Sequence, residues 1–344
     1  MNIKIFSNLE PELEDLWKTF EKKSNHTFFQ NSLFIKKLVN FKKRKNYFVV
    51  VFDSSEVIAI FPFEIKKIFG IKILQWIGTK YVDYCGPLIS QDHEISSEFF
   101  KSLWQKILDK INCDLVILDK QAKFIDNLEN PFVNFLDNFE ISKIFLIDLP
   151  DNEDEYFQNI TNKKFLSEFK RTSNKVREKY HLKFENLKMN KDELKPSDLI
   201  KKKNLMLNKN FFGKSIEKNF VNFFDDLISD FPDQIKLSVL SINKEIVSAN
   251  LGFVKNDRFY YFMPTIFKND YNKYSPGKIL ISELIKWSIQ KKIKIFDFGL
   301  GEENYKKYWS NRTETLFRHF YSKNIKGLVA LKIIKIYLFI KNFL

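Results

Sequence analysis

The chain has 344 residues, 44% hydrophobic and 29% charged, and its 57 Lys and Arg against 43 Asp and Glu give a formal net charge of +14. This composition excludes a disordered chain, and the length favours two domains of roughly 150 residues. The positive charge favours an anionic partner, such as a phosphate-bearing substrate, a nucleic acid or an acidic membrane surface, although interspersed lysines also simply solvate a surface.

Cysteine usage and hydropathy point to a reducing, aqueous compartment. Cys85 and Cys113 lie far apart among apolar neighbours, so we expect reduced core residues in a cytoplasmic protein rather than a disulfide. The first residues lack the pattern of a signal peptide, and no uncharged apolar stretch of about 18 residues occurs. The four histidines lack the paired spacing of metal ligands, so no metal site is expected.

The first half of the chain is predicted to be an α/β domain rich in strands. Apolar runs of strand length recur between polar turns, and two of them flank the turn 53–56 as a hairpin. Predicted strands span residues 3–6, 47–52, 57–61, 73–77, 114–118 and 143–149, and predicted helices begin near residues 11, 31 and 96. Pro150 and the acidic run 151–155 mark a boundary, so the first domain is predicted to be 1–150.

A polar loop follows the predicted strand 73–77. It carries Asp83 and Tyr84 before Gly86 and Pro87 end it. Polar residues in a loop after a strand often contact a ligand, so Asp83 and Tyr84 are candidates for substrate binding. Asp83 can equally cap its own turn.

The second half repeats this order and is predicted to form a domain over residues 151–325. Its predicted helices cover about 154–180 and two segments within 191–229, and its predicted strands cover 182–185, 235–242 and 246–254. The turns of the two predicted hairpins lie 189 residues apart, a weak self-similarity.

The helix predicted up to residue 180 is amphipathic and basic. Phe165, Phe169 and Val176 share one side, while basic residues that include Lys170 and Arg171 cover the others. Solvation alone explains such charges. In the functional interpretation, which the family resemblance described below implies, Lys170 and Arg171 hold an anionic substrate or cofactor. The planar guanidinium of Arg171 would suit a phosphate or carboxylate.

Residues 271–309 combine a helix start, a buried strand and a polar turn. Ser275 suits an N-cap and Pro276 the first helical position. Gly277 permits close approach of a ligand, and Lys278 adds a charge to the free N–H groups of the helix, which together suit a phosphate. An ordinary capped helix is the alternative. The following strand, 294–299, ends at Gly299, where α/β sheets place their chemistry.

These residues resemble a known family. Tyr274-Ser-Pro-Gly before a helix, then Phe296-Asp-Phe-Gly-Leu-Gly-Glu and Tyr305-Lys306 before Trp309, resemble the C-terminal half of the CelD-like acyltransferases of the GNAT superfamily, relatives of the FemAB peptidyltransferases. The resemblance reaches Tyr84-Cys-Gly-Pro-Leu and covers most of residues 30–322. It implies tandem GNAT-like α/β folds with mixed central sheets, and an acetyl-CoA or other acyl-CoA co-substrate held by Tyr274, Ser275, Pro276, Gly277 and Lys278.

Acyl transfer to an amine needs a base for the amine, donors for the oxyanion and an acid for the leaving thiolate. If the turn after the strand opens a helix, Glu302 and Lys306 share one face. Glu302 is then the candidate base, Lys306 the oxyanion donor, and Tyr305 or Tyr308 the acid, a role that a tyrosine in this region has in many GNAT enzymes. Asp297 is a further candidate. The alternative for Glu302 and Lys306 is a surface ion pair.

The sequence thus predicts a cytoplasmic N-acyltransferase whose acceptor, a small-molecule amine on a sugar or cell-envelope precursor, lies between the halves. The phosphate loop is poorer in glycine than in ordinary GNAT enzymes, so a FemAB-like transferase that uses aminoacyl-tRNA is an alternative. A non-catalytic RNA- or membrane-binding protein is another. Residues 326–344 are predicted to form an apolar helix that packs on its own domain or makes peripheral contact with the inner face of a membrane.

Overall fold

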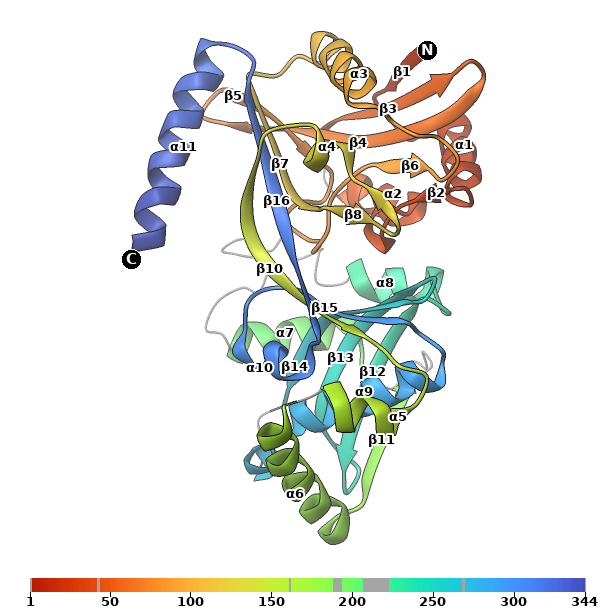
Figure 1. Cartoon of the computed structure of the whole chain (residues 1–344), viewed down its shortest axis with the longest axis vertical. Coiled ribbons are helices and arrows are strands. Elements are labelled where there is room, and N and C mark those ends of the chain that lie inside the picture. Colours follow the sequence, from red (N-terminus) through yellow and green to blue (C-terminus); the bar gives the residue numbers. More distant parts are fainter. Residues whose placement is uncertain are drawn as a thin grey trace. The chain divides into compact units, whose positions relative to one another are not determined.

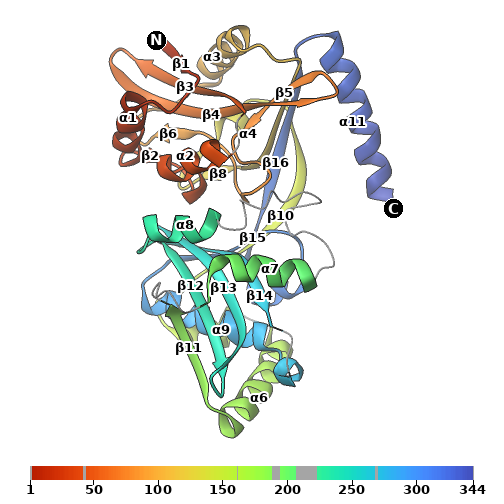
Figure 2. The same cartoon turned by 180° about the vertical axis from the view of Figure 1, so that it is seen from behind.

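The computed structural model describes residues 2–41, 44–160, 162–187, 194–206, 223–267 and 270–343. By their contacts, the residues form two compact units (Figures 1 and 2). Unit 1 comprises Met1–Ser142 and Thr315–Leu344, and unit 2 comprises Lys143–Glu314. Each unit has a mixed sheet with helices, which confirms the predicted α/β class.

Unit 1 is built on a sheet in which β5 and β7 are parallel and the other neighbours along the main path are antiparallel. Its strands run in the order β1 (Asn2–Phe6), β3 (Lys45–Asp53), β4 (Glu56–Ile68), β5 (Ile71–Trp76), β7 (Leu115–Ala122) and β16 (Arg312–Ser322, in this unit from Thr315), and the short β6 (Leu88–Ser90) pairs with both β4 and β2 (Ser24–Asn25). Its further elements are α1 (Pro11–Glu21), η1 (Phe28–Gln30), α2 (Ser32–Phe41), α3 (Ser97–Lys110), β8 (Phe124–Ile125), β9 (Leu128–Glu129), α4 (Pro131–Asn134) and α11 (Ile325–Phe343).

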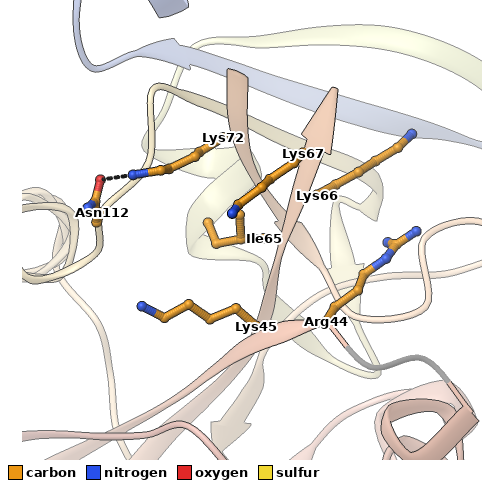
Figure 3. Close-up of a pocket in the computed structure, with 7 residues that line it drawn as sticks. All are labelled: Arg44, Lys45, Ile65, Lys66, Lys67, Lys72 and Asn112. Carbon is orange, nitrogen blue, oxygen red and sulfur yellow. Dashed lines mark hydrogen bonds between the residues drawn. The ribbon is translucent and has the colours of Figure 1, made fainter. Parts of the chain in front are cut away.

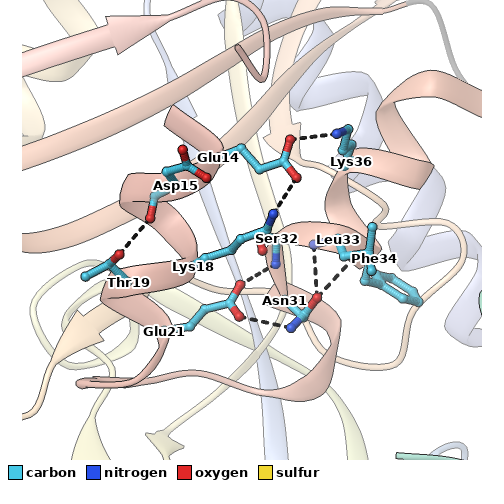
Figure 4. Close-up of polar contacts among 10 residues, drawn as sticks. All are labelled: Glu14, Asp15, Lys18, Thr19, Glu21, Asn31, Ser32, Leu33, Phe34 and Lys36. Atoms are coloured by element: carbon cyan, nitrogen blue, oxygen red, sulfur yellow. Dashed lines mark hydrogen bonds and ion pairs between the residues drawn. The ribbon is translucent and has the colours of Figure 1, made fainter. Parts of the chain in front are cut away.

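Side-chain hydrogen bonds tie the first two helices of unit 1 together (Figure 4). The side-chain oxygen of Asn31 accepts hydrogen bonds from the N–H groups of Leu33 at 3.0 Å and Phe34 at 3.3 Å, which satisfies free donors at the start of α2. The Glu21 carboxylate, at the end of α1, accepts from the Asn31 amide at 3.0 Å and from the Ser32 N–H. The start of α2 is therefore tied to the end of α1.

Unit 2 has the same order of strand directions. Its sheet contains β10 (Asn138–Asp148, in this unit from Lys143), β15 (Ile295–Leu300), β14 (Arg258–Ile266), β13 (Glu245–Lys255), β12 (Ile235–Ile242) and β11 (Leu182–Leu187). Among the described residues of this sheet, β14 and β15 are the parallel pair and the other neighbours are antiparallel. Its further elements are α5 (Glu153–Glu155), the π-helix η2 (Tyr156–Ile160), α6 (Lys163–Lys179), α7 (Pro196–Met206), α8 (Phe223–Asp230), η4 (Asp270–Tyr274), α9 (Pro276–Gln290) and α10 (Asn304–Trp309).

The two units repeat one topology, as the weak self-similarity of the sequence suggested. In unit 1 the antiparallel strands β3, β4 and β5 are followed by α3 and then by β7, parallel to β5. In unit 2 the strands β12, β13 and β14 are followed by α9 and then by β15, parallel to β14. The two predicted hairpins occupy equivalent positions in this order.

The two compact units do not divide the chain at residues 150 and 325, where the sequence predicted the domain boundaries. Strand β16 pairs with β7 from Leu316 opposite Ala122 to Ser322 opposite Leu115, so the chain returns to unit 1 after Glu314. Conversely, β10 pairs with β15 in unit 2 before Pro150 is reached. Local signals such as Pro150 do not reveal long-range pairings of this kind.

Most of the predicted elements are present. Strands β14 and β16 and the short elements β2, η1, β6, β8, β9, α4 and η4 were not predicted, and the predicted helix 154–180 is divided into α5, η2 and α6. Of the two helices predicted within 191–229, α7 and α8 are present, while 188–193 and 207–222 lie outside the described residues.

Two composition-based predictions can be compared with the structure. Cys85 and Cys113 are free and buried, as predicted, and burial raises the pKa of their thiols to about 12 and about 11. Among the helices of the described residues, none has the length and apolar character required to cross a membrane.

Candidate functional site

The parallel strands β14 and β15 are paired over only three residues. Arg258–Tyr260 lie opposite Ile295–Asp297, after which β14 continues to Ile266 and β15 to Leu300. A pocket of about 610 Å³ lies beside the unpaired part of β14. Its lining comes from α7, β13, β14, the start of α9 and the start of α10: Lys203, Ser248, Ala249, Tyr261, Pro264, Thr265, Ile266, Asn272, Ser275, Pro276, Gly277, Lys278, Leu280, Ile281, Glu303 and Tyr305.

This pocket reaches both faces of the sheet. Pro264 and Thr265 are consecutive residues of β14, so their side chains point to opposite faces. The hydroxyl of Thr265 is buried, and within the part of the chain that the structure describes it has no hydrogen-bond partner. Buried polar groups are normally paired, so this hydroxyl is an exception.

The start of α9 differs from the predicted N-cap. Ser275 lies at the N-cap position but has the left-handed conformation (φ 54°, ψ 58°), and its hydroxyl makes no capping hydrogen bond. Its carbonyl instead accepts from the N–H groups of Lys278 at 2.9 Å and Ile279 at 3.4 Å. The hydroxyl of Ser248 on β13 donates to the Pro276 carbonyl at 3.2 Å, which ties the start of α9 to the sheet.

Gly277 lies close to Ile266, so a larger side chain at this position would require Ile266 to shift. A Cβ at this position would lie 3.0 Å from Cδ1 of Ile266, which also lines the pocket. Lys278 is exposed, and its ammonium lies 5.4 Å from the centre of the Phe165 ring. Tyr274 does not line the pocket, and its hydroxyl is 3.4 Å from that of Tyr180. Four of the five predicted donor-binding residues therefore lie at one pocket.

Glu302 and Lys306 do not share one face of a helix, and they contact different partners. Helix α10 begins at Asn304, so Glu302 precedes the helix, and its carboxylate accepts from the N–H of Lys143 at 3.0 Å. The buried ammonium of Lys306 contacts the carboxylate of Glu303 at 2.9 Å. The expected helical spacing of four residues fails because the turn is longer than predicted.

Lys306 holds the turn after β15. Its ammonium donates to the carbonyls of Leu300 at 2.9 Å and Gly301 at 3.1 Å, besides its contact with Glu303. These three acceptors match the three N–H donors of an ammonium. Lys306 does not line the pocket, so its clearest role is to position Glu303, which does.

We expect the Lys306→Met variant to be less stable by about 1–3 kcal/mol, because two carbonyls and a carboxylate lose a charged donor in a mostly buried place. Denaturant unfolding measures this loss. Lys307→Met, at an exposed neighbouring position of α10, is the matched control and should be nearly neutral. Equal stability of the two variants would contradict the assigned role of Lys306.

Glu303 and Tyr305 are titratable groups of the pocket lining. Burial raises the pKa of Glu303, but the hydrogen bond and charge of Lys306 outweigh it, with a smaller effect of Lys203, so the pKa is lowered overall. Burial, followed by the charge of Glu303, raises the pKa of Tyr305 far above its usual range. At neutral pH the pocket therefore presents a carboxylate beside a protonated phenol.

Asp297 is fully buried below the pocket and does not line it. Its Oδ2 accepts from the guanidinium of Arg258 at 2.7 and 3.0 Å, and its Oδ1 accepts from the N–H of Gly299 at 2.7 Å. Asp297 and Arg258 thus connect β15 to β14 at the point where the pairing of these strands ends.

The remaining predicted residues of unit 2 lie outside the pocket. The ring of Tyr308 is 45% exposed and stacks on Phe165 at 5.1 Å. Lys170 and Arg171 are exposed on α6, a helix that contributes no residue to the pocket. Of the predicted catalytic residues, only Tyr305 lines it.

Asp83 and Tyr84 belong to unit 1. Tyr84 is buried, stacks on Phe29 with ring centres 6.2 Å apart, and its carbonyl accepts from the side-chain amide of Gln30 at 3.2 Å. Asp83 is partly buried beside it. A shared acceptor site of these residues with Lys170 and Arg171 stays a prediction.

Among the lining residues that were not predicted from the sequence are Glu303, Tyr261 and Thr265. Two of these three lie on β14, the strand that sequence reasoning passed over. Its aromatic run before Pro264 is typical of a strand, and a proline within a strand marks an edge without a hydrogen-bonding neighbour. Within the described residues, no group of three side chains is suited to holding a metal ion.

Three solved structures have a fold similar to that of this chain. The chain is similar to FemX, with a TM-score of 0.62, 9% identity and coverage of 97% of this chain and 100% of FemX. It is also similar to L-PGS from Bacillus licheniformis (TM-score 0.55, 14% identity, 96% of this chain and 98% of that one). A third similar structure is the C-terminal domain of an Agrobacterium fabrum protein described as a lysylphosphatidylglycerol synthetase (TM-score 0.55, 12% identity, 92% and 94%). At these identities, the likeness concerns the fold alone.

A match in sequence gives part of the chain a narrower assignment than the fold alone does. Residues 163–307 match the family model described as acetyltransferase (GNAT) domain, and these residues contain the whole pocket. The chain therefore has a GNAT-type domain in unit 2, and the predicted tandem of GNAT-like folds is confirmed by the repeated topology. No curated protein matches the chain in sequence. The likeness to CelD-like acyltransferases stays a prediction.

Proposed function

We propose that unit 2 catalyses transfer of an acyl group, from acetyl-CoA or another acyl-CoA, to an amine. The observation that carries the proposal is the pocket where β14 and β15 stop pairing, within the residues that match a GNAT domain. The backbone of β14 beyond Tyr260 is not paired with β15 and so can bond to the amide groups of an extended ligand arm.

The charges at the start of α9 suit the phosphates of such a donor. Gly277 lets a ligand approach the backbone, while Lys278 and Lys203 bring two positive charges to the lining. The positive end of the helix dipole adds to them. The acyl group would then point along β14 toward Glu303 and Tyr305.

The proposed chemistry is a direct transfer. The amine nitrogen attacks the thioester carbonyl, the carbon–sulfur bond breaks, the amine loses a proton and the thiolate gains one. Glu303 is the better placed carboxylate to receive the amine proton, directly or through water, and replaces Glu302 in that role. Tyr305 supplies the proton to the thiolate, because its phenol stays protonated at neutral and alkaline pH.

For the acceptor, we propose an amine of a sugar or cell-envelope precursor. The support is the likeness of the whole chain to FemX and to a lysylphosphatidylglycerol synthetase domain. The same likeness, with the net charge of +14, favours aminoacyl-tRNA as the second candidate donor. Both donors present an activated acyl carbonyl to the same attack.

We expect Gly277→Val to weaken binding of acetyl-CoA at least about tenfold, equivalent to about 1.4 kcal/mol. The added atoms would meet Ile266 and occupy the space where a phosphate approaches the helix. Calorimetric titration measures the affinity. Gly277→Ala, which adds only the Cβ, should lose less, and thermal unfolding of both variants checks the fold.

Unchanged affinity of Gly277→Val for acetyl-CoA would contradict the assignment of this pocket to the donor. If the protein bound aminoacyl-tRNA but not acetyl-CoA, and Gly277→Val lost that binding, the donor would be aminoacyl-tRNA. The assignment of a transferase would then stand. If the protein neither bound nor turned over either donor, the proposed function would be contradicted.

A further inference from the structure

Helix α11 of unit 1 exposes most of its apolar side chains. Its inner side, with Ala330, Leu331 and Ile334, packs on residues of β5 and β7. Within the described residues, the exposed large apolar side chains number fourteen, and eight of them are on α11. These eight are Ile325, Leu328, Val329, Ile333, Ile336, Tyr337, Phe339 and Ile340. An exposed apolar patch of this kind marks an interaction surface.

The lysines of α11 do not form one stripe, and one of them lies on the outward surface. At about 100° per residue, Ile325, Val329 and Ile336 point away from the packed side of the helix. Lys326 and Lys335 fall about 100° and about 80° to the two sides of Ile325, whereas the exposed Lys332 falls about 20° from it. The helix therefore has an inner packed side and an outer side on which apolar residues surround Lys332.

Contacts at the first turn fix the direction of α11. The N–H of Gly327 donates to the side chain of Asn324 at 2.9 Å, and the Asn324 amide donates to Asp114 at 2.8 Å. A Cβ at Gly327 would lie 1.8 Å from the carbonyl oxygen of Asp114, so the helix lies directly on that backbone. The ammonium of Lys323 donates to the carbonyl of Ile111 at 2.8 Å.

The tip of the β4–β5 hairpin adds a second apolar group. Phe69 in this turn is fully exposed, at 101% of its reference area. Its neighbours Ile68 and Ile71 pack on the cluster that includes the inner side of α11, so the tip lies beside this helix in unit 1. Lys67 and Lys72 are paired opposite each other just behind the tip.

These lysines belong to a basic pocket of about 570 Å³ (Figure 3). Its lining consists of Arg44, Lys45, Ile65, Lys66, Lys67, Lys72 and Asn112, without an acidic residue. Arg44 is paired with Glu64, which does not line the pocket. Burial and the charge of Arg44 lower the pKa of Lys66. Such a pocket suits phosphate groups.

We propose that unit 1 docks on a membrane surface that contains anionic lipids, through the outer side of α11 and Phe69, with the lysines behind the hairpin tip on the lipid phosphates. Charge complementarity selects this occupant: residues 315–344 contain six Lys and Arg and no Asp or Glu. A second copy fits less well, because a symmetric contact would bring the lysines of both α11 helices together. The helix lies on the surface, as none of the described helices can cross a membrane.

The test is sedimentation of the full chain with vesicles of phosphatidylcholine alone and with phosphatidylglycerol added. We expect binding that needs the anionic lipid and weakens as salt is raised. Val329→Glu combined with Ile336→Glu should reduce binding at least about tenfold, since two charges would enter the apolar layer. Phe69→Ser and Lys67→Glu should each reduce it about threefold or more.

Matched controls lie on the same unit. Phe124→Ser changes an apolar residue that is 43% exposed on β8, and Lys101→Glu changes an exposed lysine of α3, so both should bind like the parent. Thermal unfolding confirms that the α11 variants are folded. Equal binding of the α11 variants and the controls would overturn the proposal, as would an absence of vesicle binding. A dimer in light scattering that these variants dissociate, without vesicle binding, would assign the face to a second copy instead.

Discussion

Asp297→Ala should lower the free energy of unfolding by about 3–5 kcal/mol, because it leaves the mostly buried guanidinium of Arg258 without its carboxylate. The N–H of Gly299 also loses its acceptor. For a unit of this size, the melting temperature should fall by about 6–20 °C. Calorimetry or denaturant unfolding measures the change.

An exposed ion pair in the same unit provides the control. Asp151 contacts Lys294 at 2.8 Å, and its side chain is 89% exposed. Asp151→Ala should therefore leave the stability nearly unchanged. If Asp297→Ala were as stable as this control but lost turnover, Asp297 would act in the chemistry, as the sequence allowed, and not in holding β14 to β15.

Local patterns were enough to predict most elements of the fold. The apolar run 47–52 and the turn 53–56 predicted the β3–β4 hairpin, and Pro276 predicted the first residue of α9. These signals lie within a few residues of the feature that they specify. The pairing of β16 with β7 joins segments about 200 residues apart, and nothing in the sequence near either strand specifies it.

The sequence predicted the part of the site that depends on residue types at a helix start. It did not predict the part that depends on the path of the turn before α10. A glycine and a lysine after Ser-Pro indicated the start of α9 as a candidate site, and Ser275, Pro276, Gly277 and Lys278 line the pocket. The choice between Glu302 and Glu303 depended on where α10 begins, and the structure places Glu303 at the N-cap. Helix boundaries are uncertain by one or two residues, which here exchanges one carboxylate for its neighbour.

The sequence also left two tyrosines as candidates for the acid, and the structure separates them. Tyr305 lines the pocket, and its ring contacts Phe298 edge to face with the centres 6.3 Å apart. Tyr308 stacks on Phe165 outside the pocket. A Tyr→Phe change at either position removes only the hydroxyl and keeps the ring contact. The two variants therefore compare the two phenols without a difference in packing.

Tyr305→Phe should lower turnover by about 100- to 10,000-fold, because a positioned general acid contributes about that much to a proton transfer. The affinity for acetyl-CoA and the melting temperature should change little, since the ring stays in place. Tyr308→Phe should stay within about fivefold of the parent, as expected of a partly exposed residue away from the reacting atoms.

The pH dependence of turnover gives an independent check on Tyr305. Its pKa is raised, so the phenol keeps its proton up to a pH above the usual value for tyrosine. Turnover of the parent should therefore not fall between about pH 7 and 10, where an unperturbed tyrosine would begin to ionise. The carboxylate of Glu303 is already ionised in this range because its pKa is lowered, so a rise of turnover with pH would report the acceptor amine. A fall that begins near pH 8, or a Tyr305→Phe variant as active as Tyr308→Phe, would remove Tyr305 from the role of acid.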